Sequence, residues 1–267
     1  MTLLGGLMLA LIGSADLIRL TPRKSSSRSP QMLTSGVIVW GTIVVLAVLG
    51  LGVSWALMFI PFGVASLWVL TTRAGMHDRL FAGVAPALIL AAALASFLIW
   101  DRTGENLRGF VVDWHSTAPL SVVRELALPG LVVGVGVVLF LMESANVLVR
   151  IALRSTHVEP SVESQPLAGS KRWWRTNVVR TQPLIIEDLR GGRLIGPLER
   201  LLILSLTVGG LLPIVVGLIA AKGIVRFPEI SNDVVGGSKA EYFLVGSLVS
   251  WSLAFVGAGG VWLAANS

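Results

Sequence analysis

The stretch FAGVAPALILAAALASFLIW, residues 81–100, decides the fold class because its twenty residues include no ionisable side chain. At a rise of ~1.5 Å per residue, a helix of this length covers ~30 Å, the thickness of the hydrocarbon core of a bilayer. Backbone polar groups find no water inside lipid, so a crossing segment has to be a helix that pairs them internally. Comparable apolar runs recur along the chain. The sequence therefore predicts an all-α, polytopic transmembrane helix bundle.

The composition of the 267 residues agrees with this class. Hydrophobic residues make up 54% and charged residues 13%, whereas soluble domains carry about 25% charged residues. The absence of cysteine excludes disulfides, thiolate metal sites and cysteine nucleophiles. The net charge of +6 does not indicate nucleic-acid binding, because the basic residues lie between apolar runs. The abundance of Ala, Val, Leu, Arg and Gly is typical of a GC-rich genome and favours the plasma membrane of a bacterium, an actinobacterium in particular.

Charge counting sets the predicted number of spans at seven. The charge-free stretch 37–70 is thirty-four residues long and forms either one helix or two helices joined by a turn at 50–52. With two helices, fifteen basic residues fall inside and six outside; with one helix, the division is ten to eleven. The positive-inside rule selects two helices, with the N-terminus outside and the C-terminus inside. The predicted spans are about 2–18, 34–51, 54–71, 81–100, 128–150, 201–221 and 242–263.

The first of these spans is expected to be an uncleaved helix. A signal peptide carries Lys or Arg before its apolar stretch, whereas here Arg19, Arg23 and Lys24 follow it. Cleavage after the small residues 13–15 is the alternative.

Two of the loops are expected to contact lipid headgroups. Segment 151–200 is predicted to be a cytoplasmic basic loop, mobile in its Ser-, Glu- and Pro-rich first part. Indoles beside cations suit an interface with anionic lipid, and the loop holds Lys171, Arg172, Trp173, Trp174 and Arg175. Packing of this Trp pair on the protein itself is the alternative. On the outer side, 109–120 is expected to be an ordered interfacial segment that includes Trp114.

Catalytic motifs are missing from the sequence. His77, His115 and His157 have no metal-ligand spacing. The Gly pair at 191 and 196 has the spacing of a phosphate loop, but Pro197-Leu198 stands where Lys and Ser or Thr are needed. The sequence therefore predicts no catalytic residue, no cofactor and no metal site, and the chain is not expected to be an enzyme.

Two carboxylates fall within predicted spans. Asp16 has Arg19 three residues away, and Glu143 lies near Asn146 and seven residues before Arg150. An intramembrane carboxylate is a candidate proton or ion site. The alternative role for each is a hydrogen-bonded strut between helices.

The C-terminal part of the chain holds the other candidate polar sites. Glu199 and Arg200 are expected in the first turn of the sixth span, with Gly196 as cap and Pro197 at the first helical position. Near its other end, Lys222 and Arg226 share a helical face. They are expected to pair with Glu241 at the start of the seventh span.

Small residues recur every four positions on the last two spans: Gly246, Ser250, Ala254 and Ala258 on one, and Pro213, Gly217 and Ala221 on the other. Such stripes let helix backbones approach closely, so these two helices are expected to pack together. A homodimer face is the alternative.

Three C-terminal blocks carry a family resemblance. IGPLER (195–200), AAKxxxRF (220–227) and EYFLVGSLVS (241–250) resemble a signature of uncharacterised bacterial multi-pass membrane proteins of unknown function. The resemblance covers 191–250, about a quarter of the chain, and departs from the pattern at Gly223 and Ser247. It implies a membrane location and no known activity. It also adds weight to Glu199, Arg200, Lys222, Arg226 and Glu241.

Together these observations predict a non-enzymatic structural or accessory component of the plasma membrane, with a homo-oligomer or another membrane protein as its partner. A small transporter or ion-coupled permease is the alternative, and a membrane-embedded enzyme ranks third.

Overall fold

The computed structural model describes residues 2–19, 30–72, 107–155, 192–231 and 238–266, and every regular element in these ranges is helical. The expected all-α class is therefore confirmed for this part of the chain. The predicted span 81–100 and the cluster 171–175 lie outside it. The elements are α1 (Thr2–Arg19), α2 (Pro30–Val45), the π-helical η1 (Leu46–Gly50), α3 (Phe59–Thr71), α5 (Phe110–Thr117), α6 (Ser121–Glu125), α7 (Leu128–Met142), α8 (Ser144–Ser155), α9 (Gly192–Val208), α10 (Leu212–Ser231) and α11 (Ser238–Ala265).

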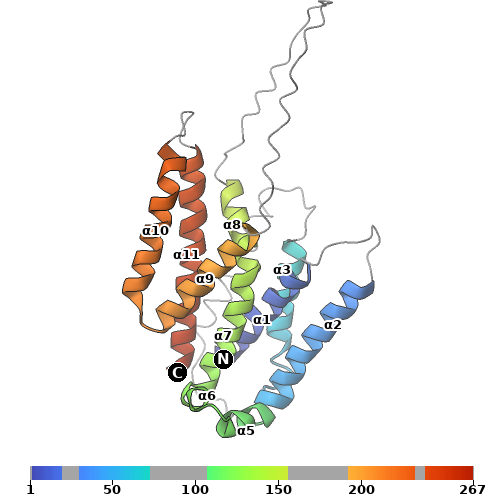
Figure 1. Cartoon of the computed structure of the whole chain (residues 1–267). Coiled ribbons are helices and arrows are strands. Elements are labelled where there is room, and N and C mark those ends of the chain that lie inside the picture. The colour runs from blue at the N-terminus through green and yellow to red at the C-terminus, as the bar shows by residue number, and fades with distance from the viewer. Residues whose placement is uncertain (1, 20–29, 73–106, 156–191, 232–237, 267) are drawn as a thin grey trace, which may run out of the picture.

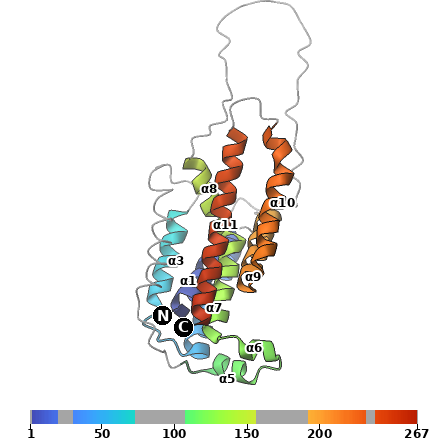
Figure 2. The ribbon, with the colours of Figure 1, turned by 90° about the vertical axis from the view of Figure 1, so that its left-hand side faces the viewer.

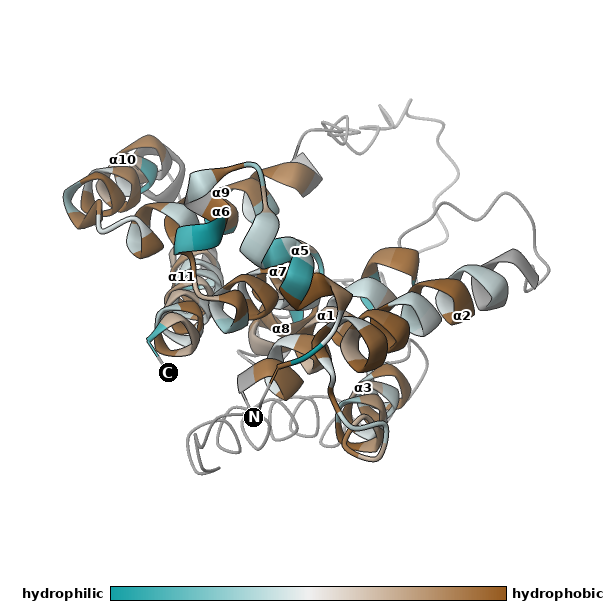
Figure 3. Cartoon of the chain, turned by 90° about the horizontal axis from the view of Figure 1, so that it is seen from below, coloured by the Kyte–Doolittle hydropathy of each residue, from teal (hydrophilic) through white to brown (hydrophobic). Residues whose placement is uncertain are grey.

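Helix α1 forms the centre of the bundle, and residues 3–16 of it are all buried. It runs parallel to α7, with α2 and α3 on one side and α9, α10 and α11 on the other (Figures 1 and 3). Gly6 permits the close approach of α1 and α7, because a Cβ atom there would lie 2.8 Å from the Cα of Val133. The hydrophobic core is therefore built around the first helix of the described chain.

The turn expected near 50–52 is confirmed. Residues 30–51 and 59–71 form two helical segments, and Gly52 between them has a φ of +74°. Only glycine adopts this left-handed backbone without strain. A Cβ atom at Gly52 would also lie 2.5 Å from the carbonyl oxygen of Arg108. The turn thus packs against the chain that leads into α5.

The helix expected over 128–150 is broken in the middle. Helices α7 and α8 meet at an angle of 47°. The residue at the break is Glu143, whose φ of −133° and ψ of −40° end α7. Its carbonyl oxygen then accepts the Asn146 N–H at 2.8 Å in the first turn of α8. The predicted intramembrane carboxylate therefore lies at the bend itself.

The single span expected over 201–221 is wrong, because the chain reverses direction there. Helix α9 ends at Val208, and α10 starts at Leu212 and runs back along the bundle (Figure 1). Gly209 and Gly210 make the reversal possible, and Gly210 has a φ of +74°. Helix α9 also starts at Gly192, so Pro197 lies inside it rather than at its first position.

This reversal changes where the chain ends. Both termini lie at the same end of the bundle in Figures 1 and 2. Packing agrees, because Gly6 of α1 lies beside Val133 of α7, and Ala265 of α11 lies beside Gly130. Seven spans with the N-terminus outside and the C-terminus inside would put the two termini at opposite ends of the bundle, so the described residues do not confirm that arrangement. We call the end with both termini the termini end, and the end with Arg150 the basic end.

Among the described residues, fewer helices than predicted are, taken one by one, both long and apolar enough to cross a bilayer. In the described chain, Ala240–Ala265 is the one unbroken helix long and apolar enough to cross a bilayer. The bent pair Leu128–Met142 and Ser144–Leu153 makes a second crossing if it is counted as one span. Three further apolar helices, 34–50, 59–71 and 212–225, are shorter.

The small-residue stripes do not pack on each other as expected. On α11, Ala254 and Ala258 are buried, and Gly246 faces Leu153 of α8. On α10, Pro213 and Ala221 are exposed, and Gly217 has open space around it. Because the α9–α10 reversal moves α10 to the edge of the bundle, the α11 stripe packs on the central helices instead.

Candidate functional site

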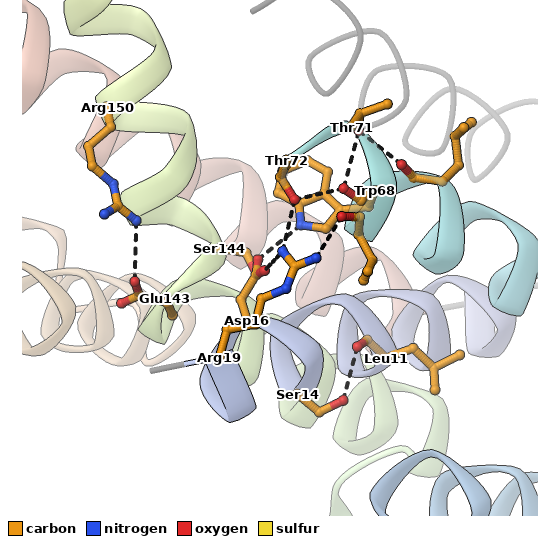
Figure 4. Close-up of polar contacts among 12 residues, drawn as sticks. Leu11, Ser14, Asp16, Arg19, Trp68, Thr71, Thr72, Glu143, Ser144 and Arg150 are labelled. Atoms are coloured by element: carbon orange, nitrogen blue, oxygen red, sulfur yellow. Dashed lines mark hydrogen bonds and ion pairs between the residues drawn. The ribbon is translucent and has the colours of Figure 1, made fainter. Parts of the chain in front are cut away.

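Asp16 binds three side chains from three helices (Figure 4). Its Oδ2 accepts the indole N–H of Trp68 at 2.9 Å and the hydroxyl of Ser144 at 2.6 Å, and its Oδ1 accepts Arg19 at 3.0 Å. Asp16, Trp68 and Ser144 are all buried, with exposed fractions of 2%, 0% and 0%. The carboxylate thereby ties α1 to α3 and to the start of α8.

Arg19 connects the same site to the end of α3. Its guanidinium donates to the Thr72 hydroxyl at 3.0 Å and to the Val69 carbonyl at 2.6 Å, as well as to Asp16. Cations that donate to the last carbonyls of a helix are favoured by the helix dipole. The expected Asp16–Arg19 pair is confirmed.

Glu143 is buried at the bend and pairs locally, as its spacing predicted. Its Oε2 accepts the Asn146 amide N–H at 2.9 Å, and its Oε1 lies 3.3 Å from Arg150. It is directed toward Arg150, whereas the next residue, Ser144, is directed toward Asp16 (Figure 4). The break in the helix thus sends two neighbouring polar side chains to two different sites.

Arg200 of α9 fills the bend from the other side, and it is only 2% exposed. Its Nε–H donates to the Leu141 carbonyl at 2.9 Å, one of the last carbonyls of α7, which the break leaves without a helical partner. Its other nitrogens donate to the Asn146 oxygen at 2.6 Å and to the Ser250 hydroxyl at 3.4 Å. Asn146 therefore bridges the Glu143 carboxylate and the Arg200 guanidinium.

Glu199, beside Arg200 in sequence, joins the last three helices. It accepts the Lys222 ammonium at 2.5 Å and the Trp251 indole N–H at 2.9 Å. The same ammonium lies 5.3 Å from the Trp251 ring centroid and 5.9 Å from that of Phe243. Such distances allow cation–π attraction.

The expected partner of Lys222 is therefore wrong. Lys222 pairs with Glu199, and Glu241 is exposed. The α9–α10 reversal explains the difference, because it brings the middle of α9, with Glu199, beside Lys222. Arg226 lies one turn further along α10, and its side chain is not among those described.

These contacts combine into one set of buried or partly buried polar side chains across the basic half of the bundle. We call this set the polar layer: Asp16, Arg19, Trp68, Thr72, Glu143, Ser144, Asn146, Arg150, Glu199, Arg200, Lys222, Ser250 and Trp251. Each of its three carboxylates has a cation within 3.3 Å. Within the described residues, no three His, Cys, Asp or Glu side chains are placed to hold a metal ion.

Several members of the polar layer were not predicted from the sequence: Trp68, Thr72, Ser144, Ser250 and Trp251. Each is a neutral residue in or next to an apolar run, where hydropathy gives it no weight, and Ser250 was expected only as a small residue that allows close helix packing. The one available signal is that a carboxylate buried in lipid needs donors, but nothing in the sequence says which helix supplies them.

No protein-family model, curated protein or solved structure matches the chain. The function therefore has to be argued from the surface and the polar layer.

Proposed function

We propose that this chain is an integral protein of a bacterial plasma membrane, with a structural or accessory role and no enzymatic activity. The observation that supports this proposal is the distribution of polar and apolar groups: the charged side chains of Asp16, Glu143 and Arg200 are buried between the helices, and the outer surface of the bundle exposes many large apolar side chains. The fully buried Arg200 and the 73% exposed Val225 illustrate the two sides. Water would favour the reverse arrangement, whereas lipid favours this one.

The apolar surface extends over the outer helices at both sides of the bundle. Monomeric soluble proteins rarely expose contiguous apolar patches of more than a few hundred Å². Here the large side chains that are at least half exposed on α2, α10 and α11 include Val37, Ile38, Leu212, Ile214, Val216, Ile224, Phe227, Leu248 and Trp262. A lipid environment accounts for all of them together.

The distribution of basic residues indicates how the bundle is oriented in the proposed membrane. With the α9–α10 reversal, Lys222, Arg226 and Lys239 join Arg150 at the basic end. If 81–100 is the span that the sequence predicts, the number of basic residues changes from fifteen inside and six outside to eighteen inside and three outside. The positive-inside rule then places the basic end in the cytoplasm and the termini end outside. An even number of passages replaces the seven predicted from sequence.

The polar layer supports a structural role rather than transport. Asp16, Glu143 and Glu199 are each paired with a cation and with a neutral donor. Carboxylates held in this way tie helices together. The resemblance of 191–250 to membrane proteins of unknown function agrees, and it adds weight to Glu199, Arg200 and Lys222. Anionic lipid at 171–175 and a membrane-protein partner or second copy remain part of the proposal.

Single-cysteine labelling tests the orientation, because the chain has no native cysteine. We expect an impermeant maleimide to label Asn266→Cys and Glu105→Cys in intact cells, and to label Ser26→Cys and Gln165→Cys only after lysis. Labelling of Gln165→Cys in intact cells would contradict the proposed orientation. Protection of Asn266→Cys would instead restore an odd number of spans.

A second candidate function, an ion-coupled permease, is favoured by one observation. Helices broken near the middle of the membrane supply ion sites in transporters, and here the break coincides with the carboxylate of Glu143. In that case the bond from Asn146 and the ion pair with Arg150 would be exchanged for an ion or a proton during transport.

Substitutions of Glu143 separate the two candidates. If Glu143 is a strut, Glu143→Gln should melt close to the parent, because the amide oxygen still accepts from Asn146, and Glu143→Leu should melt lower. If Glu143 titrates, Glu143→Gln should fold normally and abolish proton-coupled uptake in proteoliposomes. Thermal melting in detergent and a pH-sensitive dye inside the liposomes measure the two outcomes.

A further inference from the structure

A pair of short helices closes the termini end and lies across the bundle rather than along it (Figures 1 and 2). These are α5 and α6, which join the described chain at 107 to α7. His115 of α5 contacts the Leu126 carbonyl at 3.0 Å, which fixes α5 to the segment before α7. The pair is therefore an ordered part of the fold, as the sequence predicted for 109–120.

Helix α5 has three faces. At 3.6 residues per turn, Val111 and Val112 fall on one side, and both pack on the apolar cluster between α1, η1 and α7. Asp113 and Ser116 fall on a second side and are exposed. Phe110 and Trp114, one turn apart, form the third side and are 53% and 58% exposed.

The aromatic face of α5 lies next to the turn after η1. A Cβ atom at Gly50 would lie 3.4 Å from the Phe110 ring. Trp55 and Phe59 follow Gly50 by five and nine residues. They are 70% and 68% exposed, and their rings pack edge to face with their centroids 6.0 Å apart. We call Trp55, Phe59, Phe110 and Trp114 the aromatic collar.

We propose that the aromatic collar inserts into the boundary between headgroups and acyl chains of the outer leaflet, with phospholipid as its partner. This proposal rests on the proposed membrane location and adds the depth at which the protein lies in the bilayer. Trp is enriched at this boundary because its ring is apolar and its N–H is polar. A helix that lies in the boundary carries an aromatic or aliphatic face beside a polar face, and α5 has both.

Two further observations favour lipid over a protein partner. The collar is continuous with the apolar surface of α3, whose Ile60 and Phe62 are also exposed. The hydrophilic parts of α5 and α6 lie at the termini end, where Figure 3 shows them toward the viewer. The collar thus lies at the edge where an apolar side surface meets a polar end surface.

This depth places the polar layer near the cytoplasmic side. From Leu128 to Glu143, α7 rises ~22 Å at 1.5 Å per residue. A hydrocarbon core that begins at the collar is ~30 Å thick. The break at Glu143 then lies about three quarters of the way across, in the inner leaflet.

Spin labelling tests the collar on the cysteine-free parent in nanodiscs of phosphatidylethanolamine and phosphatidylglycerol. We expect nitroxides at Phe110→Cys and Trp114→Cys to collide several-fold more with oxygen, relative to a water-soluble nickel complex, than those at Asp113→Cys and Ser116→Cys. All four side chains project from the same helix and are exposed, so the four variants are matched. If one of the two aromatic variants melts below the parent, the collision ratio at the other aromatic position is enough to test the proposal.

Reference labels at Val216→Cys and Val256→Cys separate this proposal from the membrane location. If both references favour oxygen and the collar favours nickel, the collar lies in water and the proposal is wrong. If the collar is shielded from both reagents, a second copy or another protein covers it, and the proposal is again wrong. If the references favour nickel as well, the membrane location itself fails.

Discussion

Replacing Arg200 with methionine is expected to lower the free energy of unfolding by about 2–6 kcal/mol. Methionine keeps an unbranched apolar chain about as long as the aliphatic part of arginine and removes every donor. The Leu141 carbonyl and the Asn146 oxygen then lose their bonds at 2.9 and 2.6 Å in a buried site. A buried acceptor left without a donor costs about 1–3 kcal/mol. Titration of the detergent-solubilised protein with sodium dodecyl sulfate, followed by circular dichroism, measures the change.

Two further variants show that the effect belongs to this site. Arg124→Met removes an exposed arginine from α6 and should change stability by less than ~0.5 kcal/mol. Arg200→Lys should lie between Arg200→Met and the parent, because an ammonium keeps the charge without the planar fork that reaches both acceptors. Equal losses for Arg200→Met and Arg124→Met would show that Arg200 does not hold the bend.

The parts of the fold that the sequence predicted are those with a local signal. Helices over 2–18 and 242–263 follow from uninterrupted apolar runs, and Gly52 marks the turn between α2 and α3. The two breaks were missed because hydropathy does not change across them. Gly209 and Gly210 could have indicated the reversal, and so could Lys222, which a straight sixth span placed on the unfavourable side of the membrane.

The contacts of the polar layer also divide into those that have a local signal in the sequence and those that do not. Contacts between near neighbours, Asp16 with Arg19 and Glu143 with Asn146, follow from helical spacing and were predicted. Contacts between distant helices were not, since Ser144 lies 128 residues from Asp16, and Asn146 lies 54 residues from Arg200. Which helices meet is decided by the packing of α1 on α7 and by the reversal before α10. Neither can be derived from the spacing of residues along one helix.

Asp16→Ala is expected to cost about 2–6 kcal/mol of the free energy of unfolding, because it leaves two buried donors without an acceptor, at about 1–3 kcal/mol each. Most of this loss of stability should come from Trp68 and Ser144. Both are fully buried and would be left with unpaired donors, whereas the Arg19 side chain is 32% exposed and keeps contact with its surroundings. Asp16→Asn should lose less, since its amide oxygen still accepts one of the two donors.

A double-mutant cycle identifies the contact responsible for that loss. Because Asp16→Ala already removes the partner of the Ser144 hydroxyl, adding Ser144→Ala should cost less than Ser144→Ala costs in the parent. Asp113→Ala on the exposed face of α5 is the matched carboxylate control and should melt with the parent. Full additivity of the two substitutions, or equal melting of Asp16→Ala and Asp113→Ala, would show that Asp16 does not join α1, α3 and α8. If the two substitutions are coupled as predicted, Asp16 is the residue that connects the central helix α1 to the bend at Glu143.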